Sequence, residues 1–199
     1  MDTMRSEAMG TQGYAFFYSY TPSKYAPGCH YYVFSQWWPC KFKDAEGTIY
    51  TSAEQYMMAA KARTFGDTAV LKQILACEDA RKVKGLGRKV AGFNEAIWKA
   101  AGYEAVVQAN RYKFSQDLDM KAVLLDTGDT LLVEAAANDA IWGIGLAIEV
   151  APTVPEAQWP GTNLLGRALT QVRGEIRAGA LSESGELIVE GAATRSEGM

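Results

Sequence analysis

Helix-start signals spaced along the chain constrain its fold most strongly. Ser52 opens the run Ser-Ala-Glu-Gln, a capping box in which the Ser52 hydroxyl and the Gln55 amide can satisfy free backbone donors. Asp67, Asn94 and Asn163 are three more side chains of the kind that begins a helix. The predicted helices run over 53–65, 68–76, 78–84, 95–111, 118–125 and 164–177. Helix therefore outweighs strand, and the predicted fold is mainly α.

Strand signals gather in the N-terminal part. Tyr14–Tyr20 is rich in aromatic residues and is predicted as a strand, and Tyr31–Trp38 as a second extended run. Asp44–Gly47 is a turn signal between two short extended pieces. We therefore expect a compact multihelical single domain with a small N-terminal β element.

The chain divides into one domain and two ends. Its 199 residues, 48% of them apolar and 22% charged, suit a single globular domain. Residues 1–13 are small and polar and are predicted as a flexible segment. Residues 178–199 lack a sustained apolar period and are predicted as a disordered tail. The folded domain is expected over residues 14–177.

Composition excludes several function classes. The chain has 20 Lys and Arg against 23 Asp and Glu, a net charge of −3, which disfavours indiscriminate coating of nucleic acid and leaves a local basic pocket open. His30 is the one histidine, so a zinc site built on several imidazoles is excluded, and we expect no metal and no cofactor. Three scattered cysteines indicate a reducing compartment. Neither a signal peptide nor a membrane span is visible, so we expect a cytoplasmic protein away from membranes.

The helix predicted after Ser52 carries the first candidate site. Glu54, Met58 and Lys61 fall at i, i+4 and i+7 and share one helix face. Apolar surroundings raise the pKa of a carboxyl and lower that of a lysine, which prepares both for acid/base or nucleophilic chemistry. The plainer alternative is a glutamate favoured by the helix dipole together with a solvated lysine.

Two basic segments are candidates for contact with phosphate. In the segment Asn110–Asp117, Arg111 and Lys113 could hold a phosphate while the neighbouring aromatic residues stack on a base. The alternative is a helix C-terminus whose basic residues meet the dipole. The second segment, Lys82–Lys89, is more typical of a solvated face than of a phosphate grip.

Two glycine-rich loops complete the candidate segments. In Asn138–Gly145, a carboxylate followed by a tryptophan and two glycines suits a tight loop that comes close to a ligand, or a plain turn. The loop Gly161–Arg167 enters a helix and offers free N–H groups to an anion, unless Asn163 is an ordinary N-cap.

These segments, in this order, resemble a known family. The motifs are Phe34-Ser35-Gln36-Trp37-Trp38-Pro39-Cys40, Tyr50-x-Ser52-x-Glu54-Gln55-Tyr56 with Ala60-Lys61, Lys84-x-x-Gly87-Arg88, Lys113-Phe114-x-Gln116, Asp139-x-x-Trp142-Gly143-x-Gly145, and Gly161-x-Asn163-x-Leu165-Gly166 followed by Val172-Arg173. The set is similar to the NADAR family of YbiA-like proteins and spans residues 17–173. The resemblance implies a mostly helical, compact N-glycosidase.

The resemblance also implies roles for particular residues. Cleavage of a ribosyl C–N bond builds positive charge on the sugar, which a carboxylate stabilises. We expect Glu54 as the principal acid/base and Asp139 as the residue that holds water or ribose. Lys61 and Lys113 are the expected amines, which stabilise the leaving group or phosphate or form a Schiff base with ring-opened ribose. The expected substrate-binding residues, as phosphate contacts, ring walls or motif positions, are Trp38, Tyr56, Arg63, Arg111, Trp142, Gly143, Asn163 and Arg167.

The resemblance leaves three functions open. The first is hydrolysis of the C1′–N bond in phosphorylated ribosyl–base compounds, chiefly early riboflavin-pathway intermediates, as metabolite repair. The second is removal of ADP-ribose from guanine in nucleic acid. The third is a non-catalytic module that binds ADP-ribose or a nucleotide. The expected partner is a small phosphorylated ribosyl substrate, with ADP-ribosylated nucleic acid as the alternative, and no obligatory protein partner.

Overall fold

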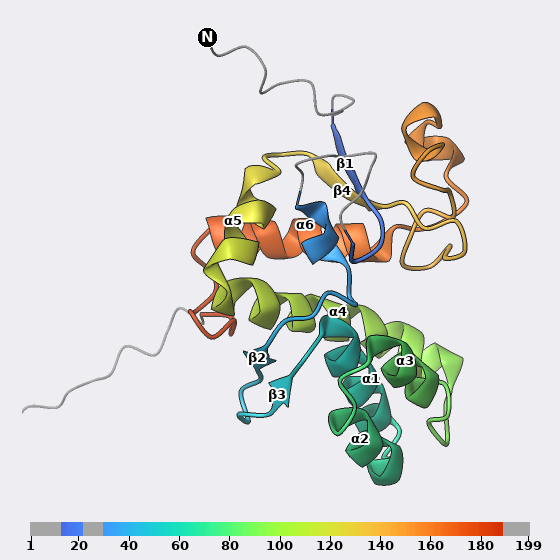
Figure 1. Ribbon diagram of the computed structural model, residues 1–199, viewed down its shortest axis with the longest axis vertical. Helices are drawn as coiled ribbons and strands as arrows, with labels where there is room; N and C mark the ends of the chain where they lie inside the picture. The colour runs from blue at the N-terminus through green and yellow to red at the C-terminus, as the bar shows by residue number, and fades with distance from the viewer. Residues whose placement is uncertain (1–12, 22–29, 189–199) are drawn as a thin grey trace, which may run out of the picture.

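The computed structural model describes residues 13–21 and 30–188, and Figure 1 shows their arrangement. The helices are α1 (Ala53–Thr64), α2 (Thr68–Leu75), α3 (Ala80–Gly87), α4 (Glu95–Gln116), α5 (Leu118–Asp126) and α6 (Leu164–Arg177). The strands are β1 (Tyr14–Phe17), β2 (Phe42–Lys43), β3 (Ile49–Tyr50) and β4 (Leu131–Glu134), and short 3-10 helices cover Tyr31–Phe34, Ala151–Thr153 and Glu156–Gln158. The predicted mainly α fold is confirmed.

The capping box at the start of α1 forms as the sequence predicts. The Ser52 hydroxyl accepts the Gln55 N–H at 3.1 Å, and the Gln55 side-chain oxygen accepts the Thr51 N–H at 2.7 Å. The Gln55 side-chain nitrogen donates in turn to the carbonyl oxygens of Ile74 and Cys77, at 3.0 and 2.9 Å. One side chain therefore both starts α1 and ties it to the end of α2.

Asp67 and Asn94 cap α2 and α4 as predicted, each by accepting a main-chain N–H of the first turn. Asn163 differs. It has a left-handed conformation, with φ of 52°, and its side chain does not cap α6. Its oxygen accepts the Glu134 N–H at 3.0 Å, and its nitrogen donates to the Leu132 carbonyl at 2.9 Å. The prediction of an ordinary N-cap is wrong because this amide is used to hold β4.

Helix α4 divides the molecule into two parts (Figure 1). Helices α1, α2 and α3 pack together on one side of it, and α5, α6 and the β1–β4 pair lie on the other. β1 pairs in parallel with β4, with Tyr14 opposite Leu131 and Phe17 opposite Glu134. The β element is thus completed by a strand far along the chain, because β4 offers β1 its edge. β2 and β3 form the small antiparallel pair expected around the Asp44–Gly47 turn.

Residues 31–38 differ from the extended run that their aromatic content predicts. Tyr31–Phe34 form a 3-10 helix, and a turn follows in which the Trp38 N–H donates to the Ser35 carbonyl at 3.2 Å. An extended segment needs a neighbouring strand to satisfy its main-chain groups. Here these groups are satisfied locally and by the Lys113 ammonium, which donates to the carbonyls of Val33 and Ser35.

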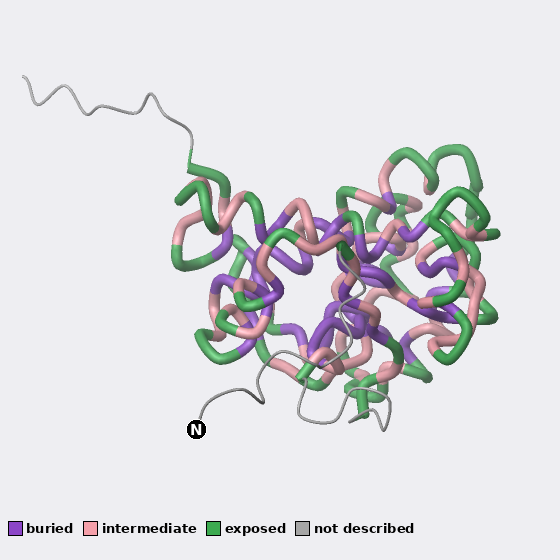
Figure 2. The backbone as a smooth tube through the Cα atoms, turned by 90° about the horizontal axis from the view of Figure 1, so that it is seen from above, coloured by how far each residue is buried: buried purple, intermediate pink, exposed green. Residues whose placement is uncertain are grey.

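A single main core joins the two parts. Figure 2 shows the buried residues along the inner sides of the elements, with the exposed residues around the periphery. The core contains Phe17 from β1, Phe34, Phe114 from α4 and Leu169 from α6, all nearly or completely buried. A smaller cluster, which includes Val133 and Ile144, lies around the loop after β4. The carboxyl end of β4 is therefore held between two apolar clusters.

The predicted disordered tail is wrong for its first eleven residues. Residues 178–188 form a turn in which Leu181 and Leu187 bridge, and Gly185 packs on α4 so closely that a Cβ there would lie 2.7 Å from the Arg111 carbonyl oxygen. The Tyr112 hydroxyl also donates to the Glu186 carboxylate. These long-range contacts leave no local signal in the sequence. Residues 1–12 and 189–199, for which flexibility or disorder was also predicted, lie outside the described residues.

Candidate active site

Glu54 lies in the first turn of α1 and is buried. Its N–H donates to the Gln36 carbonyl at 2.9 Å, which fixes the helix start against the loop after Tyr31–Phe34. Burial raises the pKa of the Glu54 carboxyl, the positive charge of Lys84 and a hydrogen bond from Trp37 oppose the rise, and the charge of Asp139 adds to it. Glu54 and Asp139, the two carboxylates expected to act together, therefore share one electrostatic environment.

Asp139 lies in the loop after β4. One of its carboxylate oxygens accepts the N–H groups of Ile141 and Trp142, at 3.0 and 2.8 Å, and so shapes the turn. Gly143 is buried there, and a Cβ on it would come within 2.9 Å of the carbonyl oxygens of Glu134 and Asp139. The glycine is thus required by the close approach of two main-chain segments. The Trp142 ring packs against the main core.

Glu134 is a site residue that the sequence reasoning missed. It ends β4, and its Oε2 atom is buried without a hydrogen-bond partner among the described residues. Burial raises the pKa of its carboxyl to about 8, and the charges of Asp139 and Glu54 add to the rise while Lys84 opposes it. A charged residue that ends an apolar strand just before the Asp139 motif was the available signal. Glu54, Glu134 and Asp139 are called the carboxylate cluster below.

Helix α3 supplies the positive charge next to the carboxylate cluster. α1 and α3 approach so closely that a Cβ on Gly87 would lie 2.0 Å from the Met58 sulfur. This approach brings Lys84 and Arg88 to the predicted face of α1, where both oppose the rise in the pKa of Glu54. The basic segment Lys82–Lys89, which was predicted as a solvated face, therefore contributes two residues to the candidate site.

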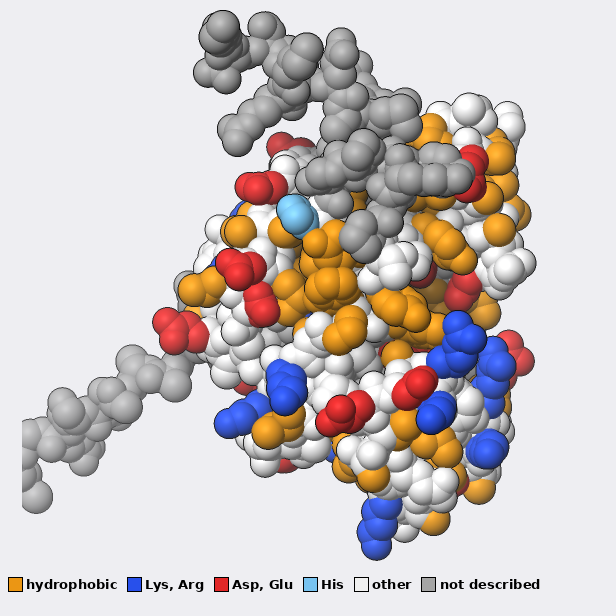
Figure 3. Space-filling view, in the orientation of Figure 1, with side chains coloured by type: hydrophobic (Ala, Val, Ile, Leu, Met, Phe, Trp, Pro, Cys, Tyr) orange, Lys and Arg blue, Asp and Glu red, His pale blue; other side chains and the backbone are white. Residues whose placement is uncertain are grey.

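Figure 3 shows this arrangement on the molecular surface. Lys and Arg side chains gather on the side of the molecule where α3 lies, and the surface above them is hollowed, with hydrophobic and acidic side chains inside. Trp37 contacts both a basic side chain, Lys84, and an acidic one, Glu54. The Lys84 ammonium is 5.6 Å from the centroid of a Trp37 ring, and the Tyr20 ring, 39% exposed, is 6.0 Å from it. The cluster thus has an aromatic wall as well as a cationic one.

Lys61 lies almost two turns further along the same face of α1. Its ammonium is 4.1 Å from the centroid of the Phe93 ring and 5.9 Å from that of Trp98. Partial burial, together with the charge of Arg88, lowers the pKa of Lys61. Lys61 therefore packs its ammonium against the start of α4, and its partners lie outside the carboxylate cluster.

Lys113 is fully buried in α4. Its ammonium donates to the main-chain carbonyls of Val33 and Ser35, at 2.5 and 3.1 Å. Burial lowers the pKa of Lys113 to about 8, and electrostatic interactions with Cys40 and Asp117 oppose the fall. These partners lie outside the carboxylate cluster, and the contacts hold the turn that carries Trp37.

The structure does not bring Tyr56 and Arg63 to the carboxylate cluster. Tyr56 is about 200° around α1 from Glu54 and packs in an aromatic group, with its ring 4.9 Å from that of Tyr50. Arg63 donates to the Tyr50 hydroxyl at 2.7 Å and lies 3.9 Å from Asp44. Both residues therefore stabilise the contact of α1 with β3.

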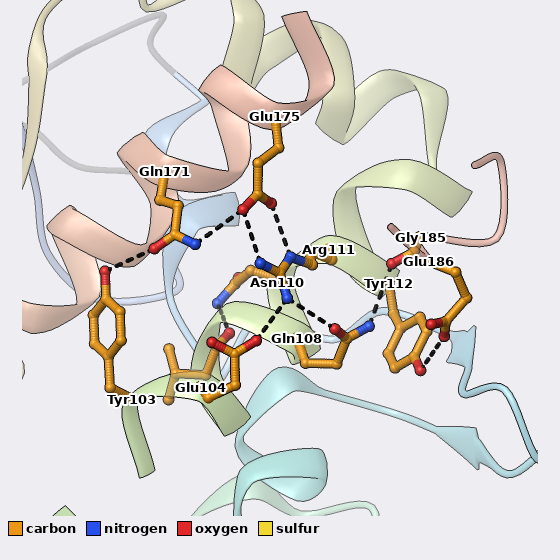
Figure 4. A network of polar contacts seen from close by, with 11 residues as sticks. Tyr103, Glu104, Gln108, Asn110, Arg111, Tyr112, Gln171, Glu175, Gly185 and Glu186 are labelled. Carbon is orange, nitrogen blue, oxygen red and sulfur yellow. Dashed lines mark hydrogen bonds and ion pairs between the residues drawn. The ribbon is translucent and has the colours of Figure 1, made fainter. Parts of the chain in front are cut away.

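Arg111 is engaged in a network that ties α4 to α6 (Figure 4). Its guanidinium makes two hydrogen bonds of 2.8 Å to Glu175, one of 2.6 Å to Glu104 and one of 3.0 Å to Gln108. Gln171 donates to Glu175 as well, at 2.9 Å. A phosphate would have to displace these carboxylates, so the geometry favours a structural role. These five residues are called the Arg111 network below.

Trp38 and Arg167 also have local partners. The Trp38 ring centroid is 4.6 Å from that of Tyr32. Arg167 is exposed, donates to the Thr162 carbonyl at 3.1 Å and lies 3.8 Å from Glu156. Of the two neighbouring tryptophans it is Trp37, which the expected site did not include, that contacts the Glu54 carboxylate.

Among residues 13–21 and 30–188, no group of three or more His, Cys, Asp and Glu side chains is placed to hold a metal ion. In the same part of the chain, no helix has the length and apolar character needed to cross a membrane.

Comparison with known proteins identifies the family. Residues 16–177 match the NADAR domain model. N-glycosidase R617 of Acanthamoeba polyphaga mimivirus is 46% identical over 171 residues, which cover 84% of this chain and 98% of that protein. Riboflavin biosynthesis protein VVA0006 of Vibrio vulnificus is 31% identical over 153 residues, 77% of this chain and 38% of that longer protein.

A solved structure supports the same conclusion for the fold. The NMR structure of the Escherichia coli protein YbiA matches with a TM-score of 0.67 at 24% identity, over 88% of this chain and 91% of that one. The chain belongs to the NADAR domain family, as its ordered motifs predicted.

Proposed function

We propose that this protein hydrolyses the C1′–N bond of phosphorylated ribosyl–base compounds, with early riboflavin-pathway intermediates as its preferred substrates. The enzyme class rests on the family: relatives such as R617 are N-glycosidases by name, and this chain is, like them, a hydrolase that acts on N-glycosyl bonds. The name of VVA0006, a riboflavin biosynthesis protein, supports the choice of substrate.

The observation that carries the proposal is the carboxylate cluster beside the cations of α3. When the C1′–N bond breaks, positive charge develops on the ribosyl ring, and a fixed carboxylate in a water-poor site stabilises that charge strongly. Glu54 and Asp139 are placed for this task, one at the start of α1 and the other in the loop after β4. Lys84 and Arg88, whose charges already act on Glu54, supply the counter-charge for a substrate phosphate.

The aromatic wall fits the other half of such a substrate. A planar base offers its face to an indole, and a stacked pair of rings contributes about 1 kcal/mol beyond the area that it buries. Trp37 is partly exposed and contacts both Glu54 and Lys84, so a ring stacked on it would lie between the acidic and basic groups. In this arrangement the base leaves along Trp37 while the ribosyl phosphate stays between the carboxylates and α3.

One observation favours the second candidate, removal of ADP-ribose from guanine in nucleic acid. Arg81, Lys82 and Lys89 are exposed on or next to α3 and extend the positive surface beyond the site. A polynucleotide would gain from such a surface, because each neutralised phosphate adds to affinity and to its salt dependence. The net charge of −3 counts the other way.

The test compares the two substrates with one preparation of the full chain. The ribosylaminopyrimidine phosphate and a DNA oligomer with ADP-ribosylated guanine are supplied separately, and released ribose 5-phosphate or ADP-ribose is measured by mass spectrometry. Glu54→Gln is the inactive control. Turnover of the small substrate supports the first proposal, and turnover of the oligomer alone supports the second. Binding of either substrate without turnover by the wild type would instead indicate a non-catalytic module.

A further inference from the structure

Glu134 is held more rigidly than a surface glutamate at the end of a strand would be. Its N–H donates to the Asn163 side chain at 3.0 Å, and its carbonyl accepts the Ile144 N–H at 2.9 Å. Gly143 lies against the same carbonyl, where a Cβ would approach to 2.8 Å. The loop after β4 and the residue that precedes α6 therefore fix the main chain from which the Glu134 carboxyl extends.

The surroundings of that carboxyl are unbalanced. The charged groups that face it are Asp139 from the loop after β4, Glu54 from α1 and Lys84 from α3. The Asn163 amide at the start of α6 is uncharged, and both its oxygen and its nitrogen bond to the main chain of β4. Two negative charges against one positive charge favour a neutral carboxyl. Its Oε2 atom, buried and without a partner among the described residues, is then free to donate to a substrate atom.

We propose that Glu134 is the catalytic proton donor to the leaving nitrogen, while Glu54 stays ionised and faces the ribosyl cation. This inference rests on the proposed function and divides the roles within the same site. It differs from the expectation that Glu54 is the principal acid. Three contacts favour the ionised form of Glu54: the charges of Lys84 and Arg88 and the hydrogen bond from Trp37. Only one of these, the charge of Lys84, acts on Glu134.

The step balances as a hydrolysis. The C1′–N bond breaks with its electron pair going to nitrogen, and the Glu134 proton passes to that nitrogen, which leaves as the free base or amine. Water then adds to C1′, and the proton that this water loses passes to the cluster and returns to Glu134. The products are the ribosyl hydroxyl compound and the protonated leaving group, and no oxidant or cofactor takes part.

The inference predicts a particular dependence on pH. Because the pKa of Glu134 is raised to about 8, its carboxyl is mostly neutral at pH 7 and loses its proton as the pH rises through this pKa. The rate constant kcat/KM should therefore fall on the alkaline side, with a midpoint near the same pKa. Below pH 8 the donor form is present in most molecules.

The experiment replaces Glu134 by glutamine in the full chain. Glu134→Gln should lower kcat about 100- to 1,000-fold with little change in KM, and it should abolish the alkaline fall in kcat/KM. Its melting temperature at pH 8 should rise clearly above that of the wild type, because a neutral amide removes a buried charge that the fold tolerates poorly. A merely structural glutamate would show lost stability instead. Glu156→Gln, at an exposed carboxylate outside the cluster, is the matched control.

Direct titration gives a readout that does not need turnover. The Glu134 signal is assigned in ¹³C-glutamate NMR spectra as the one that Glu134→Gln removes. Its midpoint should lie near 8, and a midpoint near that of an exposed glutamate would overturn the inference. An active wild type together with a fully active Glu134→Gln would overturn it while leaving the proposed function intact. A wild type that cleaves no N-ribosyl substrate would overturn both.

Discussion

The carboxylate cluster and the Arg111 network treat buried charge in opposite ways. In the network, one guanidinium meets two carboxylates and a glutamine, and Glu175 is bound a second time by Gln171 (Figure 4). In the cluster, the charge of Lys84 acts on both Glu54 and Glu134, the charge of Arg88 acts on Glu54, and one oxygen of Glu134 has no partner among the described residues. The network gains stability from its paired charges. The cluster instead has a buried oxygen without a hydrogen-bond partner and an excess of negative charge, and a substrate could satisfy both.

The largest effect should follow from neutralising the cluster at Glu54. Glu54→Gln keeps the shape of the side chain and removes the carboxylate that the proposed mechanism places opposite the ribosyl cation, so kcat should fall about 1,000-fold. The melting temperature should hold or rise, because burial already disfavours the ionised form. Steady-state kinetics and thermal unfolding measure both quantities. Wild-type turnover in this variant would remove Glu54 from the mechanism.

A substitution in the Arg111 network should instead lower the free energy of unfolding. Arg111→Ala leaves Glu175, which is 17% exposed at its side chain, without its main partner. Loss of one member of a buried ion pair costs about 3 kcal/mol of unfolding free energy. Urea unfolding at pH 7 tests this, with Arg177→Ala as the control, because the Arg177 contact with Asp129 is almost fully exposed on the aspartate side. Equal, small losses in the two variants would contradict the structural role.

The contributions of the two regions to folding stability should also change with pH in opposite directions. The pKa of Glu175 is lowered by Arg111, so its contribution to stability is present above the pKa of the unfolded chain and is lost as the pH falls. The pKa of Glu134 is raised to about 8, so its contribution is present below its ordinary pKa and is lost as the pH rises from about 4.5 to about 8.

Unfolding free energies measured from pH 2.5 to pH 9 test this contrast. Glu134→Gln should be more stable than the wild type at pH 9, by up to about 5 kcal/mol for the full shift of the pKa, and nearly equal to it at pH 4. Glu175→Gln should lose stability at pH 7 and match the wild type more closely at acid pH. Parallel pH profiles for the wild type and Glu134→Gln would show that ionisation of Glu134 does not destabilise the fold.

A smaller effect is expected at the cationic wall. Lys84→Gln removes one of the two charges of α3 that face Glu54, so KM for a phosphorylated ribosyl substrate should rise about 10-fold. The pKa of Glu54 should rise further as well, because the Lys84 charge opposes the effect of burial. Lys82→Gln, at an exposed neighbour on the same helix, is the matched control. Equal KM values in the two variants would place the phosphate elsewhere.

The sequence could predict what local rules decide. Ser52, Asp67 and Asn94 cap helices through neighbours three residues away, and these contacts form as expected. Glu54 and Asp139 were expected as a pair because both stand in the family motifs, and the structure places them in one electrostatic environment.

Long-range partners decided the rest. Arg111 was expected to contact phosphate, but Glu175, which occupies its guanidinium, lies 64 residues along the chain. Glu134 was missed because its surroundings are made by α1, α3 and the loop after β4 together. Asn163 was read as a cap for its own helix, and its preference for the β4 main chain depends on a segment about 30 residues earlier.

The pairing of β1 with β4 has a consequence for the order in which the protein assembles during synthesis. Helices α1 to α3 contact one another over short stretches of chain and can pack as soon as they leave the ribosome. β1 must wait for residues 131–134, with which it pairs, and β4 must wait for Asn163. Glu54 is thus made early, but the other two carboxylates reach it only after most of the domain has been translated. The carboxylate cluster is therefore complete only after residue 163 has been translated, so a nascent chain that stalls before this residue can hold a helical core and still lack the cluster.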